Sequence, residues 1–163
     1  DKTLLTSAEI PLCSTAHRGQ NGNCSPHGYH RTMTRIHDQS ITAETLNARG
    51  CTLCEQAEFT QALTAFDQAL ALDSRYPNAW NNRGNALSGL RRYAEALAAY
   101  DRAVALNPDY HQAWFNRGKL LTEMGAYGNA VASYDRAIAL GDDPVYHHAR
   151  ASIWLKKQLV EMV

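Results

Sequence analysis

The sequence lacks the features that mark several large classes of protein. No apolar run approaches the roughly 18 residues that a membrane-spanning helix needs, so we expect no membrane insertion. The 16 basic residues are balanced by 16 acidic ones, and no basic stripe of the kind that neutralises nucleic-acid phosphates is present. We therefore expect no nucleic-acid binding. Four cysteines would be few for a small scaffold held together by disulfide bonds.

Motifs of catalysis and of secretion are also missing. The chain has no glycine loop that could cradle a phosphate and no nucleophile elbow between a strand and a helix. His147 and His148 are adjacent, and adjacent residues of a helix point in different directions. The first residues, Asp1-Lys2-Thr3, do not have the charged and apolar regions of a signal peptide. We expect a non-enzymatic protein located in the cytoplasm.

What the sequence does contain is a repeat. In residues 77–144 one pattern occurs twice, with a step of 34 residues between matching positions such as Trp80 and Trp114. A third copy occupies residues 43–76. A period of this length that consists of two helical patterns predicts a stack of helical hairpins. We expect helices at residues 43–56, 59–73, 77–90, 93–107, 111–124, 127–140 and 145–161.

Residues that recur once per repeat predict how the helices pack. Gly84 and Ala96 are small enough to let the two helices of a hairpin approach closely, and Tyr100 would fill the space beside Ala103. Leucines would continue the apolar seam through the chain, at Leu53, Leu87, Leu121 and Leu155.

Charged residues recur with the same period. Arg83 and Arg117 precede the glycines of their repeats, as Arg49 does in the first, and an aspartate follows each arginine 18 residues later. A guanidinium near a packed helix interface needs a partner, because an unpaired buried charge is costly. We predict a ladder of ion pairs within repeats, such as Arg83 with Asp101. The alternative is that these charges are solvated on separate faces.

These residues carry a resemblance to a known family. The second repeat has Trp80, Gly84, Leu87, Ala96, Tyr100, Ala103 and Pro108 at the places where tetratricopeptide repeats have Trp, Gly, an aromatic or Leu, Ala, an aromatic, Ala and Pro. The third repeat keeps six of these places and has Asp142 for the proline, and the first has Leu46 for the tryptophan. The resemblance implies an all-α, right-handed superhelical solenoid of three hairpins, 43–76, 77–110 and 111–144, with a capping helix at 145–161.

The resemblance also implies a binding site. In this family the first helix of each hairpin lines a concave groove that holds a peptide or a partner protein, so we expect an adaptor or scaffold. Most of the matching residues carry carboxamides, which can grip a peptide backbone. They are Asn47, Asn78, Asn81, Asn82, Asn85, Gln112, Phe115, Asn116, Lys119 and Tyr146. The equivalent Asn82 and Asn116 resemble the asparagine ladder of O-GlcNAc transferase, although asparagine is also a tolerated surface residue.

A comparison with co-chaperones of the family gives a different result. These proteins grip a carboxyl terminus with two Lys, an Arg and two Asn, and the matching places here are Asn47, Cys51, Asn82, Gln112 and Asn116. Only Asn82 fits, and all three cations are missing, so the charge-assisted contacts to a terminal carboxylate cannot form. We expect a peptide of mixed character instead.

Residues 1–42 differ from the rest of the chain. They have no helical periodicity, and by composition they cannot bury enough apolar surface to fold unaided. Besides Cys13 and Cys24 they contain four histidines: His17, His27, His30 and His37. The extension could become ordered by lying in the groove of its own chain. It could also lie in the groove of a second copy, which would make a homo-oligomer.

The cysteines leave several interpretations open. Cys51 and Cys54 are spaced for one helix face and could join Cys13, Cys24 and histidines of the extension in a zinc site. Disulfide bonds between the extension and the repeats are a second possibility, and small apolar core residues a third. A reactive redox pair is disfavoured, because Cys51 and Cys54 occupy the second half of their helix, where the dipole disfavours a thiolate.

Overall fold

The computed structural model describes residues 41–161, without the side chains of residue 155 and of residues 157–161. This part contains seven α-helices and no strand. The helices are α1 (Ala43–Glu55), α2 (Phe59–Leu72), α3 (Pro77–Gly89), α4 (Tyr93–Leu106), α5 (His111–Glu123), α6 (Tyr127–Leu140) and α7 (Pro144–Glu161). Their bounds confirm the seven helices expected from the sequence. In the described part, no helix is long and apolar enough to cross a membrane.

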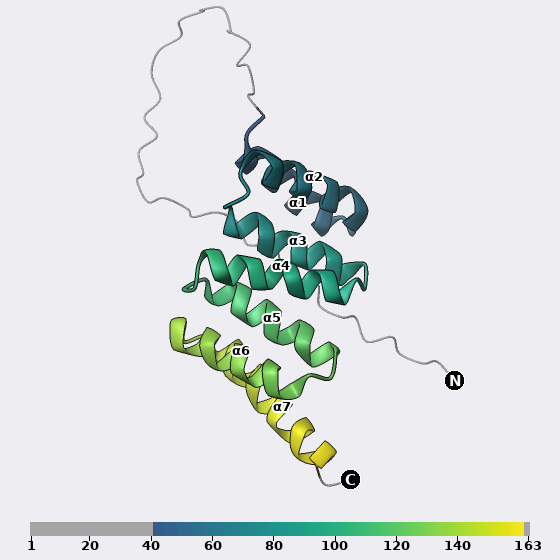
Figure 1. The fold of residues 1–163 in the computed structure, drawn as a ribbon. Coiled ribbons are helices and arrows are strands. Elements are labelled where there is room, and N and C mark those ends of the chain that lie inside the picture. Colours follow the sequence, from purple (N-terminus) through teal and green to yellow (C-terminus); the bar gives the residue numbers. More distant parts are fainter. Residues whose placement is uncertain (1–40, 162–163) are drawn as a thin grey trace, which may run out of the picture.

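The helices form a solenoid of hairpins that stack in chain order (Figure 1). Each helix packs against the next, and α1, α3, α5 and α7 also contact one another in succession. Among the described residues, the even-numbered helices make no such contacts with each other. The odd-numbered helices therefore form the inner, more closely spaced layer of the stack. The all-α solenoid expected from the sequence is confirmed.

Local sequence explains where the helices begin and where the hairpins turn. Thr42 and Thr45 cap α1 reciprocally, because each backbone N–H donates to the other residue's hydroxyl. The three hairpins turn at equivalent places through residues with left-handed backbone: Ala57 (φ 60°), Arg91 (φ 59°) and Gly125 (φ 76°). Only the glycine adopts this conformation without steric cost.

The close approach predicted within each hairpin is confirmed. A Cβ atom built on Gly84 would lie 2.6 Å from Cε1 of Tyr100, and one on Gly118 would lie 2.8 Å from Cε1 of Tyr134. The tyrosine rings thus lie directly on the glycines of the facing helix, where no larger side chain would fit. Leu87 and Leu121 of the predicted seam are buried, whereas the side chain of Leu155 lies outside the described residues.

The inter-repeat loops are held by the tryptophans that helped to reveal the repeat. Nε1 of Trp80 donates to the carbonyl oxygen of Ser74 at 2.9 Å, and Nε1 of Trp114 donates to that of Pro108 at the same distance. Each ring thereby joins an inner helix to the loop before it, which fixes one hairpin against the next.

The arginine–aspartate ladder exists, but the predicted pairing is wrong. Arg83 pairs with Asp67 and Arg117 with Asp101, both at 2.7 Å between Nε and Oδ1, so Asp101 does not pair with Arg83. Each arginine reaches the aspartate that precedes it by 16 residues, on the outer helix of the preceding repeat. The pairs are partly exposed and individually weak, but they connect successive repeats.

The carboxamide ladder on the inner helices

The side chains predicted to line the groove lie on the inner helices, and several are joined by hydrogen bonds. Asn82 on α3 donates from Nδ2 to Oδ1 of Asn47 on α1 at 3.0 Å, and Sγ of Cys51 lies 3.3 Å from the same nitrogen. Oδ1 of Asn82 accepts from Nδ2 of its neighbour Asn81 at 3.2 Å. The Asn82 amide therefore binds both across the helix interface and along its own helix.

The same arrangement recurs one repeat further on. Asn116 on α5 donates from Nδ2 to Oδ1 of Asn81 at 3.0 Å, and its own Oδ1 accepts from Nε2 of Gln112 at 3.4 Å. Five residues on three successive inner helices are thus connected, and we call them the carboxamide ladder: Asn47, Asn82, Asn81, Asn116 and Gln112.

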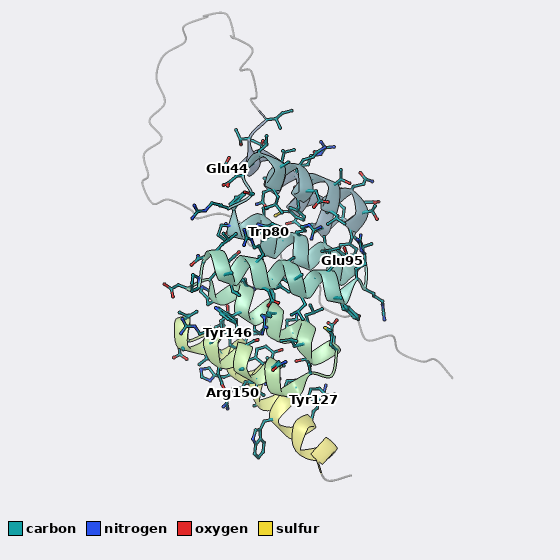
Figure 2. The ribbon with its side chains drawn as sticks, in the orientation of Figure 1. Glu44, Trp80, Glu95, Tyr127, Tyr146 and Arg150 are labelled. Carbon is teal, nitrogen blue, oxygen red and sulfur yellow. The ribbon has the colours of Figure 1, made fainter. Side chains whose placement is uncertain are left out.

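The ladder ends at α7 in a cluster of aromatic residues. Tyr146 on α7 donates its hydroxyl to Oε1 of Gln112 at 3.4 Å, and Nδ1 of His111 lies 2.8 Å from the same hydroxyl. The Tyr146 ring packs on that of Phe115, with 4.6 Å between the centroids. Figure 2 shows Tyr146 and Arg150 on the last helix; Arg150 pairs with Asp135 of α6. Burial raises the pKa of Tyr146 above its ordinary value.

Burial corrects the expectation that the carboxamides are exposed. Asn81 and Asn82 are completely buried, and Asn47, Asn85 and Asn116 are nearly so. The reason is that successive inner helices contact each other at these side chains, which bond to one another across the interface. The polar predicted residues that stay partly accessible are Asn78, Gln112 and Lys119. Among the apolar ones, Phe115 and Tyr146 are buried.

The pattern of bonds also differs from a simple asparagine ladder. Equivalent residues such as Asn82 and Asn116 are not bonded to each other but are connected through Asn81. Phe115 stands one repeat after Asn81 and has no amide, so the pattern stops there. His111, which contacts the Tyr146 hydroxyl, was not predicted as a site residue, because only its position beside Gln112 marked it in the sequence.

Asn85 differs from the other carboxamides. Its Oδ1 accepts a hydrogen bond from the Tyr100 hydroxyl at 2.7 Å. Its Nδ2 is buried and has no hydrogen-bond partner. Lys119, at the equivalent place on α5, carries its ammonium group 5.9 Å from the centroid of the Phe115 ring. These two residues thus leave donors that the ladder does not use.

The proposed metal ligands are only partly within the described structure. Cys51 and Cys54 are buried on α1. Cys13, Cys24 and the histidines of the extension lie outside the described residues. Among the side chains that the structure describes, no three of His, Cys, Asp or Glu are grouped so that they could hold a metal ion. The zinc site therefore stays a prediction that depends on residues 1–40.

Solved structures with a similar fold are domains of tetratricopeptide repeats, abbreviated TPR. The Sgt2 TPR domain from Aspergillus fumigatus superposes with a TM-score of 0.71 at 20% identity, covering 74% of this chain and 82% of that one. The first TPR of Spaghetti (RPAP3) bound to the HSP90 peptide SRMEEVD has a TM-score of 0.70 at 24% identity, with 76% and 98% covered. The first TPR domain of the human RPAP3 protein superposes with a TM-score of 0.71 at 23% identity, covering 74% of this chain and 95% of that one.

Comparison at the level of sequence identifies the family. No curated protein matches this chain in sequence. The pattern described as a tetratricopeptide repeat matches residues 82–144, and a second, described as a TPR repeat, matches residues 50–90. Together they span residues 50–144, more than half of the chain, and both fall on the helical hairpins and on the glycines that the tyrosine rings cover. The chain belongs to the tetratricopeptide repeat family.

Proposed function

We propose that this chain is an interaction module that binds a peptide segment of a partner protein along the inner helices α1, α3, α5 and α7. The observation that carries the proposal is the carboxamide ladder, which connects three of these helices through buried hydrogen bonds. A ladder of this kind holds neighbouring helices in one arrangement, and a preorganised surface loses less entropy on binding.

The contacts to a peptide would come from polar side chains beside the ladder. Asn78, Gln112 and Lys119 are partly accessible. Gln112 is bonded at both ends, to Asn116 and to Tyr146, so its position is fixed before a ligand arrives. A fixed carboxamide can donate to and accept from the backbone of an extended peptide, whatever the peptide's side chains are.

The similar RPAP3 domain holds an HSP90 peptide, but in this chain none of the places that match the co-chaperone cations carries a cation. Asn82, the one residue that matches the co-chaperone pattern, already donates to Asn47 and lies against Cys51. We infer that the partner of this chain is recognised by other contacts than the grip on a terminal carboxylate.

Peptide selection from a displayed random library, followed by fluorescence anisotropy on the selected peptides, tests the proposal. We expect Gln112→Ala to weaken binding by about tenfold, because a buried or fixed hydrogen-bonding group is worth about 1–1.5 kcal/mol. The matched control is Gln68→Ala, which removes an exposed carboxamide from the outer helix α2. Equal effects of the two variants, or the absence of any selected peptide, would contradict the proposal.

A further inference from the structure

Helix α7 is shifted by one residue relative to the period of the repeats. The loop before it, residues 141–143, is one residue shorter than the equivalent loops before α3 and α5. Arg150 is therefore the seventh residue of its helix, as Arg83 and Arg117 are of theirs. Each of these arginines pairs with an aspartate of the outer helix before it. The ion pairs thus show which residues of α7 are equivalent to those of α3 and α5.

This register places a tryptophan where the other inner helices have a leucine of the apolar seam. Trp154 is the eleventh residue of α7, as Leu87 is of α3 and Leu121 of α5. Leu87 and Leu121 are 0% and 3% exposed, because each packs against the outer helix of its own repeat. Trp154 is 52% exposed. Among the described helices α7 contacts only α5 and α6, and neither of them covers this side chain as an outer helix covers each leucine.

A small residue lies on the same face of α7. Ala151 is exposed and is the eighth residue of its helix, which is the place of Gly84 in α3 and of Gly118 in α5. In those hairpins an aromatic ring of the outer helix lies directly on the glycine, as Tyr100 lies on Gly84. Ala151 and Trp154 are three residues apart and are therefore neighbours on one helix face. This face thus offers both a small residue that can receive an aromatic ring and an aromatic residue.

We propose that this face of α7 pairs with the same face of α7 in a second copy of the chain. Two α7 helices packed antiparallel about a twofold axis bring Trp154 of each copy onto Ala151 of the other. The outer helices α2, α4 and α6 already pack on inner helices of their own chain, so a second copy offers its α7 rather than one of them. Because Ala151 has a Cβ atom that the glycines lack, the two α7 helices would lie further apart than the helices of a hairpin.

The charges of the chain and the position of α7 are compatible with this pairing. The formal net charge is zero, so two copies do not repel each other at long range. Arg150, beside Ala151, is already paired with Asp135. Figure 1 shows α7 at one end of the stack and α1 at the other. A dimer formed through α7 would therefore carry two copies of the proposed peptide-binding surface, which would favour partners with two binding segments.

Sedimentation equilibrium of the full chain over a range of concentrations tests the proposal, in a reducing buffer with a chelator so that disulfide bonds and metal play no part. We expect a monomer–dimer equilibrium. Trp154→Ala should raise the Kd of the dimer by about thirtyfold or more, because it removes the central aromatic residue from both halves of the interface. Ala151→Glu should also raise the Kd, because it places an unpaired carboxylate against the tryptophan of the other copy. Circular dichroism of both variants checks that the helices remain.

The matched control is Val145→Ala on the same helix. Val145 is 57% exposed, and its nine-residue separation from Trp154 places it on the opposite side of α7. The Kd of this variant should stay within about twofold of that of the unchanged chain.

Three outcomes would overturn the proposal. The first is a chain that stays monomeric up to about 1 mM. The second is a dimer that responds equally to Trp154→Ala and Val145→Ala, which would place the contact elsewhere, for example at a groove filled by the extension. The third is a monomer that binds a synthetic peptide of residues 127–140 and loses this binding in Trp154→Ala. That result would show that α7 accepts an outer helix from another protein instead of a second copy.

Discussion

Replacing Asn82 with alanine would show what the buried carboxamides do. The substitution removes the donor to Oδ1 of Asn47 at 3.0 Å and to Sγ of Cys51 at 3.3 Å, and the acceptor for Nδ2 of Asn81 at 3.2 Å. Asn82 is completely buried, so water cannot replace these bonds without opening the helix interface. Each hydrogen bond contributes about 0.5–1.5 kcal/mol, and a buried partner left unsatisfied costs about 1–3 kcal/mol. We expect the free energy of unfolding to fall by about 2–4 kcal/mol.

Urea denaturation followed by circular dichroism measures this change. A double-mutant cycle with Asn47→Ala isolates the bond across the α1–α3 interface, and we expect a coupling energy of about 0.5–1.5 kcal/mol. The matched control is Asn78→Ala, which removes a partly accessible carboxamide from the same helix. Its effect should lie within about 0.5 kcal/mol, as for other surface substitutions.

A stability of Asn82→Ala close to that of the unchanged protein, together with zero coupling to Asn47, would refute this reasoning. It would mean that the Asn82 amide is not engaged within the protein and is available to a ligand. In that case Asn82→Ala should weaken peptide binding without changing the unfolding transition, as the sequence alone suggests for a carboxamide-lined groove.

Three further predictions concern packing, ionisation and metal. Gly84→Ala should destabilise the protein by about 1–3 kcal/mol, because its Cβ would overlap the Tyr100 ring. Gly128→Ala, whose Cβ would meet no atom within 4 Å, should be neutral or stabilise it by up to about 1 kcal/mol in urea denaturation. Burial raises the pKa of the Tyr134 hydroxyl. Tyr134 therefore ionises first in the unfolded chain, and the free energy of unfolding should fall as the pH rises above about 10. Urea midpoints at increasing pH measure this fall, and Tyr134→Phe should make the midpoint depend less on pH. Native mass spectrometry of non-reduced protein should show one added zinc ion per chain if the cysteine site exists.

Each of these predictions has a result that contradicts it. Equal unfolding free energies for Gly84→Ala and Gly128→Ala would show that the ring contact does not limit the packing of α3 on α4. A urea midpoint that stays constant in alkaline solution would contradict the effect of burial on Tyr134. A metal-free mass would remove the zinc interpretation, and the same spectrum would show whether two copies associate.

Much of the architecture could be predicted because it depends on distances within one repeat. The glycine of the inner helix, the alanine and the aromatic residue of the outer helix recur with a fixed period, and a hairpin that cannot bury its apolar face alone must stack on its neighbours. For this reason the helix bounds and the close approach of the two helices at Gly84 agreed with the sequence pattern, whereas the contact of Gly84 with the Tyr100 ring became evident only in the structure. The position of the tryptophans was equally evident, although their bonds to the inter-repeat loops were not.

The sequence by itself determined the period, the helices and the residues of the inner layer, whereas only the tertiary structure decided which of those residues meet. Arg83 pairs with Asp67 rather than Asp101, and Asn116 bonds to Asn81 rather than to the equivalent Asn82. Both outcomes depend on how far one repeat is shifted and rotated against the next, and a strictly periodic sequence does not contain that offset. The same offset buries the asparagines and leaves the amide nitrogen of Asn85 without a partner, because side chains at an interface between successive helices bind whatever the packing brings within reach.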